Sequence, residues 1–276
     1  MFENAKRFNG NIDAWDVSQL ETASTMFQNA TSFNSDLSGW NVGNLQYAFG
    51  MFRGASNFES NLRDWNTASL AVTEAMFART NRFNSDLAWD VSGVASMSDM
   101  FYEAGAFNGD VSSWQVGQVR SMRRMFGRSN FNRDISRWDV GRVTNMLGMF
   151  FDSPFDQDIS GWNVANVQNF DVMFTFNNVF NRDITGWDVG SATQMQGMFG
   201  YSVFNQDISG WNVASVTTMQ IMFSQAVSFN QNLCAWGLLL DSSTNVENAF
   251  ASTGCESVND PNFETSPPGP FCAVCA

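Results

Sequence analysis

One sequence unit of 24 or 25 residues recurs ten times along the 276-residue chain. Each repeat begins with a phenylalanine, by which we name it, and positions are counted from that residue as +0. Every repeat also carries a tryptophan in register, and most carry a Met-Phe pair. A fixed period of about 20–50 residues is typical of solenoids, in which each unit buries its apolar face only against its neighbours. The ten residues at +0 are Phe8, Phe33, Phe58, Phe83, Phe107, Phe131, Phe155, Phe180, Phe204 and Phe229.

Apolar spacing within a repeat predicts its local structure. In repeat Phe131, Trp138 and Val140 are two residues apart, which is typical of a short strand. Met146 and Met149 follow Val143 at intervals of three, which is helical spacing. A hydroxyl residue at the start of this second segment suits a helix N-terminus, as at Thr144, Thr193 and Thr217. We therefore expect an α/β solenoid of about ten coils, each with a short parallel strand and a short helix. The stacked indoles would need hydrogen-bond acceptors, for which turn carbonyls are expected.

The repeat pattern predicts two domains, a repeat solenoid over 1–236 and a C-terminal cap over 237–276. The first residues, MFENAKRF, match the end of a repeat, so the chain starts mid-repeat without a visible N-terminal cap. No signal-peptide pattern is present. We expect a segment of a longer protein or a gene start placed at an internal Met, with a genuine N-terminus as the alternative.

All four cysteines lie in the last 43 residues, beside a Pro-rich tail. They predict a disulfide-locked cap in an oxidising compartment. Three pairings are open, and Cys234 with Cys255 is favoured because it would link adjacent coils. A zinc or redox site at CAVC is the alternative. The cysteines are Cys234, Cys255, Cys272 and Cys275.

Composition excludes several functions. The net charge of −13 argues against general nucleic-acid binding, because phosphate contact needs cationic surface. No apolar run is long enough for a membrane span. The chain has no histidine, the commonest general base and metal ligand. These features predict a protein that is not an enzyme and needs no cofactor, with calcium as the one possible exception.

The full unit, of the form F-N-x-D-I-S-G-W-D-V-x-x-V-T-x-M-x-x-M-F-x-x-A, resembles the repeat of BspA-like, DUF285-type bacterial surface proteins. The resemblance covers about residues 1–250, and repeat Phe58 departs from it with Glu59 and Thr67. It implies a leucine-rich-repeat-like solenoid, surface display or secretion, and a role in adhesion or recognition. It supplies no catalytic motif.

Two polar columns are expected to be structural. An asparagine at +1 in most repeats can hydrogen-bond along the stack. Position +3 carries six consecutive aspartates, which would repel one another unless each carboxylate caps its own turn. Clustered carboxylates could instead hold calcium. The six residues are Asp86, Asp110, Asp134, Asp158, Asp183 and Asp207.

The residue after each tryptophan should point outward from the strand face and form a shallow, weakly acidic surface. A solvated surface is one interpretation, and a binding face for glycan hydroxyls or a basic protein edge is the other. Seven arginines between Arg120 and Arg142 also form a local patch in sequence. Arg137 shares the face with Asp139. The predicted ligand- or partner-binding residues are Arg137, Asp139, Gln115, Asp188 and Asp90.

Three functional hypotheses follow. The first is a non-catalytic, extracellular or cell-surface recognition or adhesion module that binds protein or glycan through the strand face. The second is a structural part of a larger surface assembly or filament. The third is a carbohydrate-active enzyme with paired aspartates, which the regular columns disfavour.

Overall fold

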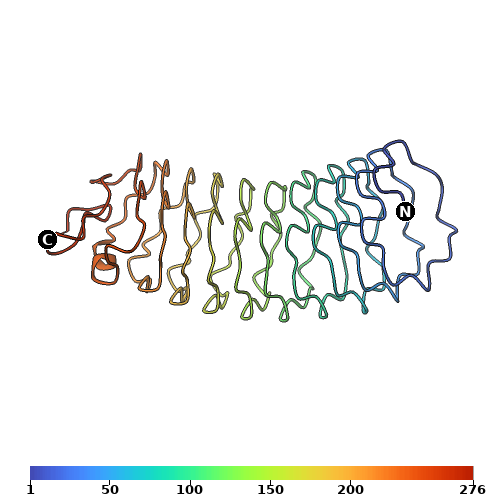
Figure 1. Ribbon diagram of the computed structural model, residues 1–276, viewed down its shortest axis with the longest axis horizontal. Helices are drawn as coiled ribbons and strands as arrows, with labels where there is room; N and C mark the ends of the chain where they lie inside the picture. The colour runs from blue at the N-terminus through green and yellow to red at the C-terminus, as the bar shows by residue number, and fades with distance from the viewer. Residues whose placement is uncertain (276) are drawn as a thin grey trace. The chain divides into compact units, whose positions relative to one another are not determined.

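The computed structural model describes residues 1–275. Its contacts divide the chain into two compact units, Met1–Asp139 and Val140–Ala276. Within each unit the chain runs as a series of coils, and each coil lies beside the next (Figure 1). The expected boundary between repeats and cap, at 236/237, falls inside the second unit, and Ala276 lies outside the described residues.

The expected α/β solenoid with a strand and a helix in each coil is wrong. Among residues 1–275 the one helix is η1, a five-residue 3-10 helix at Cys234–Leu238. In place of strands the described chain has isolated β-bridges. The parallel ones join Thr22 to Tyr47, Tyr47 to Val72, Ser96 to Ser121, Asn145 to Asn169, Asn169 to Gln194, Gln194 to Thr218 and Thr218 to Asn245. The antiparallel ones join Asn262 to Gly269 and Phe271 to Ala273.

The Met-Phe segment forms a ladder of turns where a helix was expected. In the first repeats, alternate residues donate their backbone N–H to the next coil at N···O distances of 2.7–2.8 Å, in the pairs Ala23 to Tyr47, Thr25 to Phe49, Phe27 to Met51 and Asn29 to Arg53. The intervening Met26, Gln28 and Ala30 donate to the carbonyl three residues earlier in their own coil. These turns also bring every third side chain inward, so they produce the spacing that predicted a helix.

Two residues in each turn ladder adopt a left-handed backbone. They lie four positions apart, as Thr25 (φ 54°) and Asn29 (φ 56°) do. Even β-branched residues occur there, including Val172 (φ 49°) and Ile221 (φ 53°). This conformation costs a non-glycine residue about 1–2 kcal/mol. Hydrogen bonds between coils and burial of the adjacent Met and Phe side chains must offset that cost. Because these contacts come from neighbouring coils, the local sequence does not predict the left-handed positions.

Replacing Gly197 by alanine is expected to lower the free energy of unfolding by about 1–2 kcal/mol, because Gly197 is left-handed at φ 60°. An added Cβ would also lie 3.3 Å from a Val172 methyl group. Gly210→Ala is the matched control, since nothing lies within 4 Å of its Cβ position. Urea unfolding followed by tryptophan fluorescence should separate the two variants. Equal stabilities would contradict the turn ladder.

The segment around each tryptophan is not a strand, because its backbone lacks a continuous ladder to the neighbouring coil. In most repeats it is held instead by the indole, whose Nε1–H donates to a carbonyl of the preceding coil, as Trp40 does to Ile12 at 3.0 Å and Trp211 to Ile184 at 3.2 Å. Trp236 is an exception, because its Nε1–H is buried without a partner among the described residues. The expected carbonyl acceptor is thereby confirmed. The hydroxyl of Thr217, expected to begin a helix, donates to the Thr193 carbonyl of the preceding coil at 2.9 Å.

Aromatic columns form the core of each unit. In unit 1 the Met-Phe phenylalanines stack from coil to coil, with ring centroids 5.6 Å apart for Phe27 and Phe52. Each ring also stacks on the next +0 phenylalanine of the chain, as Phe27 does on Phe33 at 4.0 Å. Apart from Trp15, the tryptophans are at most 4% exposed. One coil could not exclude water from these rings alone, so stacking is the main source of apolar burial.

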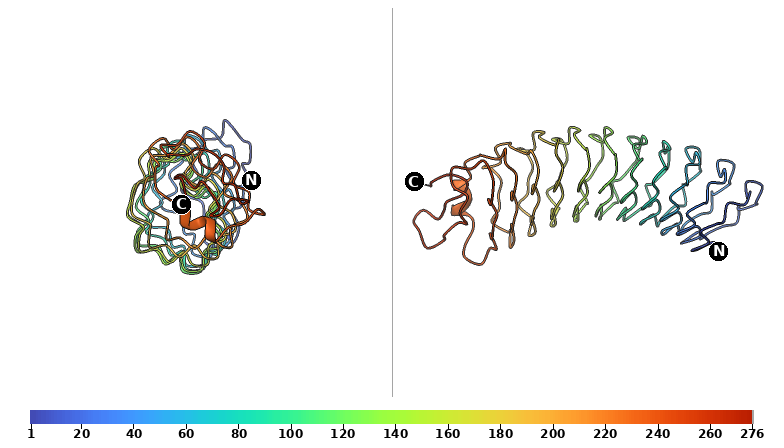
Figure 2. Two further views of the ribbon diagram at one scale, coloured as in Figure 1. Left: turned by 90° about the vertical axis from the view of Figure 1, so that its left-hand side faces the viewer. Right: turned by 90° about the horizontal axis from the view of Figure 1, so that it is seen from above.

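The C-terminal part of unit 2 closes over its last coil with η1 and the tail, as Figure 2 shows. The Leu233 N–H donates to the Phe271 carbonyl, which brings the tail back onto the start of η1. Cys234 pairs with Cys275, and Cys255 pairs with Cys272. The favoured Cys234–Cys255 pairing is therefore wrong, because the returning tail supplies a partner to each cysteine.

Candidate functional site

Asparagines at +1 link successive coils. In most repeats the side-chain Oδ1 accepts the backbone N–H of the same position in the next coil, as Asn9 does from Asn34 at 2.8 Å and Asn205 does from Asn230 at 3.0 Å. In repeat Phe58, Glu59 still donates its N–H to Asn34 at 2.9 Å. The predicted structural role of this column is confirmed, so it is not a candidate binding site.

Aspartates at +3 cap turns, as predicted. Five of the six accept the backbone N–H two residues ahead at 2.9–3.0 Å; these are Asp110, Asp134, Asp158, Asp183 and Asp207. Asp86 instead accepts the N–H of Asp110 at 2.8 Å. Hydrogen bonds from the backbone and hydroxyl of Ser112 lower the pKa of Asp110. Among residues 1–275 no three acidic, His or Cys side chains group closely enough to hold a metal ion.

A second ladder of capped turns follows the tryptophans. The exposed residue after Trp accepts, through its side-chain Oδ1, the backbone N–H of the residue two positions ahead. Asp16 accepts from Ser18 at 3.0 Å, Asn41 from Gly43 at 3.3 Å and Asp188 from Gly190 at 3.0 Å. Asp90 accepts both the N–H and the hydroxyl of Ser92 at 2.9 and 2.6 Å, which lowers the pKa of Asp90. This face is thus a row of short polar side chains held against the backbone.

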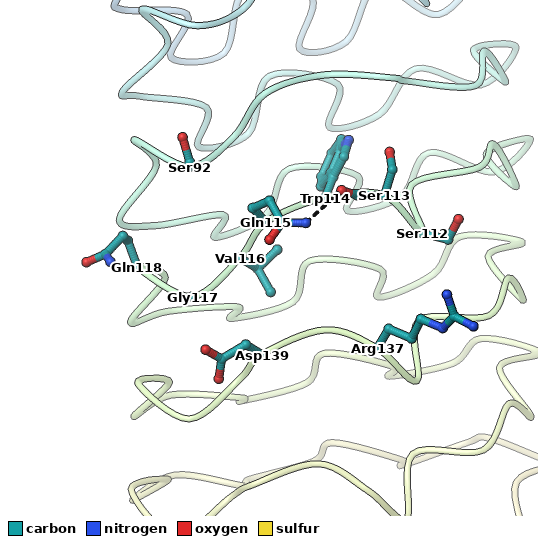
Figure 3. Close-up of a pocket in the computed structure, with 10 residues that line it drawn as sticks. All are labelled: Ser92, Ser112, Ser113, Trp114, Gln115, Val116, Gly117, Gln118, Arg137 and Asp139. Carbon is teal, nitrogen blue, oxygen red and sulfur yellow. Dashed lines mark hydrogen bonds between the residues drawn. The ribbon is translucent and has the colours of Figure 1, made fainter.

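Repeat Phe107 interrupts this second ladder. Gln115 replaces the usual Asp or Asn, and its Nε2 donates to the Ser113 carbonyl at 3.3 Å, so the turn after Trp114 lacks the side-chain cap. An open depression of about 550 Å³ lies here. Figure 3 shows Gln115 within it, with Arg137 and Asp139 extending from the following coil. A Cβ on Gly117 would lie 3.1 Å from Asp139 Oδ2, so the glycine leaves room for the Asp139 carboxylate beside the backbone of residue 117.

A second depression, of about 410 Å³, adjoins the first. Ser112, Ser113 and Arg137 line both of them, and Asp134 completes the second. We call the two together the Gln115 depression. Its lining side chains offer hydroxyl, amide, carboxylate and guanidinium groups, whereas Trp114 is only 2% exposed. The site can therefore form many hydrogen bonds but offers no aromatic platform.

The structure gathers some of the predicted binding residues and not others. Gln115, Arg137 and Asp139 line the Gln115 depression. Asp90 contributes only through its bonds to Ser92, which lines the depression, and Asp188 caps its own turn in unit 2. Sequence reasoning missed Ser92, Ser112, Ser113 and Gln118, although the glutamine in an otherwise Asp/Asn column was a signal for the interruption.

The arginine patch seen in sequence does not form one surface. Arg123 and Arg124 both bind the carboxylate of Asp99, at 2.9 and 2.6 Å. Arg133 donates to the Asn108 carbonyl at 2.8 Å, and Arg137 lines the Gln115 depression. Neighbours in the chain project from different sides of a coil, because one repeat makes a full turn.

Stacked coils of a 24–25-residue repeat, joined by side-chain ladders, define a repeat protein. The family model described as "Mycoplasma protein of unknown function, DUF285" matches residues 1–88, 60–157, 85–177 and 151–262. The chain belongs to this family, as the repeat pattern indicated. No curated protein and no solved structure matches it. Residues 1–275 contain no helix with the length and apolar character needed to cross a membrane.

Proposed function

We propose that this protein is a non-catalytic, extracellular or cell-surface recognition module that binds its ligand at the Gln115 depression. The observation that carries the proposal is the interruption of the capped-turn ladder in repeat Phe107, where Gln115, Arg137 and Asp139 line one open depression. Mixed donors and acceptors in an open site suit the hydroxyl groups of a glycan, with a protein edge as the other ligand class. The two disulfides support an oxidising, extracellular location.

Replacing Arg137 or Asp139 by alanine is expected to reduce glycan affinity at least about tenfold, because each loses a charged hydrogen-bonding group. Binding of the full chain to a glycan array, followed by titration with the best glycan, measures the effect. Asn41→Ala is the matched control, since Asn41 occupies the same column in a regular turn. Unchanged binding by both variants would contradict the site, and absence of binding by the wild type would contradict the glycan ligand.

A structural role in a surface assembly is the second candidate. It is favoured by an exposed aromatic pair in unit 2, Phe176 and Tyr201, whose rings stack 4.6 Å apart while 41% and 48% of each residue stays exposed. Exposed aromatic surface is common at protein interfaces. Concentration-dependent sedimentation of the wild-type protein would distinguish an assembly from a monomeric module.

A further inference from the structure

A smaller pocket of about 270 Å³ lies at the turn ladders of unit 1. Its charged lining residues include Arg53, Glu74, Arg79 and Arg124, and its aromatic ones are Phe49 and Tyr102. We call it the Glu74 pocket. It shares no residue with the Gln115 depression, so the proposed function does not use it. Its volume lies just below the usual range for ligand sites, about 300–1,000 Å³.

Ion pairs hold part of the pocket wall in place. Arg79 Nε lies 2.8 Å from Glu103 Oε2, and Arg124 Nε lies 2.6 Å from Asp99 Oδ1. The guanidinium of Arg124 also lies over the Tyr102 ring, 4.6 Å from its centroid. These contacts satisfy Arg79 and Arg124 and fix one aromatic wall.

Two side chains of opposite charge in the same pocket, Glu74 and Arg53, are not paired with another side chain among the described residues. Glu74 Oε2 is buried and has no hydrogen-bond partner among residues 1–275. Over the same described residues, the Arg53 side chain makes no hydrogen bond and no ion pair. Their charged groups therefore stay more than 4.0 Å apart. A carboxylate oxygen buried without a donor is costly, so the free pocket lacks a cationic group beside Glu74 and an anionic group beside Arg53.

A dipolar ligand supplies both groups at once. We propose that the Glu74 pocket binds a free α-amino acid, with its ammonium group at Glu74 and its carboxylate at Arg53. Arginine suits the second role because its planar guanidinium can bind a carboxylate through two parallel hydrogen bonds. Phe49, which is 43% exposed, and the Tyr102 ring offer apolar surface to the ligand side chain. An aromatic amino acid is therefore the expected ligand.

Isothermal titration of the full chain with L-phenylalanine tests the proposal. Glu74→Gln and Arg53→Gln should each weaken binding at least about tenfold, because each removes one charged partner of the ligand. Glu21→Gln, a charge change on an exposed residue outside the pocket, should bind as the wild type does. Thermal melting of each variant checks that the fold is retained.

Blocked ligands test the same idea on the unaltered protein. N-acetyl-phenylalanine lacks the ammonium group and phenylalaninamide lacks the carboxylate, so both should bind at least about tenfold more weakly than L-phenylalanine. Equal binding of either compound would overturn the dipolar ligand. Failure of the wild type to bind any of phenylalanine, tyrosine, tryptophan and leucine at millimolar concentration would overturn the site, whatever happens at the Gln115 depression.

Discussion

Replacing Phe199 by alanine is expected to lower the free energy of unfolding by about 3–5 kcal/mol. Phe199 is fully buried, and its ring stacks on Phe204 at 4.0 Å, on Phe223 at 5.6 Å and on Phe174 at 5.8 Å. Removal of the ring takes away apolar burial and leaves a cavity bordered by three coils, which cannot collapse without shifting the ladders on either side. Urea unfolding followed by tryptophan fluorescence gives the measurement.

Phe176→Ala is the matched control, because Phe176 belongs to the same unit and is 41% exposed. Its main described partner is Tyr201, so the loss should be about 1 kcal/mol or less. A Phe199→Ala protein that unfolds at the same urea concentration as the Phe176→Ala protein would show that the stacked rings do not stabilise the unit.

Removal of the Cys234–Cys275 disulfide, with both residues changed to alanine, should destabilise the chain by about 4 kcal/mol. The reason is that this bridge closes a sequence separation of 41 residues, which restricts the unfolded chain. Removal of the Cys255–Cys272 disulfide, with a separation of 17, should cost about 3 kcal/mol. Unfolding is measured under non-reducing conditions.

Reduction of the wild-type protein is the control for this pair, and it should destabilise the chain at least as much as either double variant. Mass spectrometry of tryptic peptides under non-reducing conditions checks the pairing itself. A peptide that joins Cys234 to Cys255 would contradict the structure, and unchanged unfolding after reduction would show that the bridges do not lock the end of unit 2.

The Gln115 depression could be predicted from the sequence only in part. Arg137 and Asp139 were expected on the face because each lies beside Trp138, whose register the repeat fixes. The sequence could not place Ser92 or Ser112 in the depression, because their positions relative to Gln115 and Arg137 depend on how adjacent coils stack. The Glu74 pocket was missed altogether. It combines residues of different repeats on the turn ladders. A helix was expected in these segments, and a helix would have placed other side chains next to Glu74 and Arg53.

Residue type and period by themselves determined that the chain stacks its tryptophans, that asparagines link the coils and that aspartates cap the turns. Those features depend on chemistry that repeats at every coil. Only the tertiary structure decided the path of the backbone between them. Left-handed residues such as Thr25 and Val172 are unfavourable alone, and they are stabilised by N–H groups that meet carbonyls of the adjacent coil. The same holds for the cysteines, whose pairing was fixed by the return of the tail over the last coil.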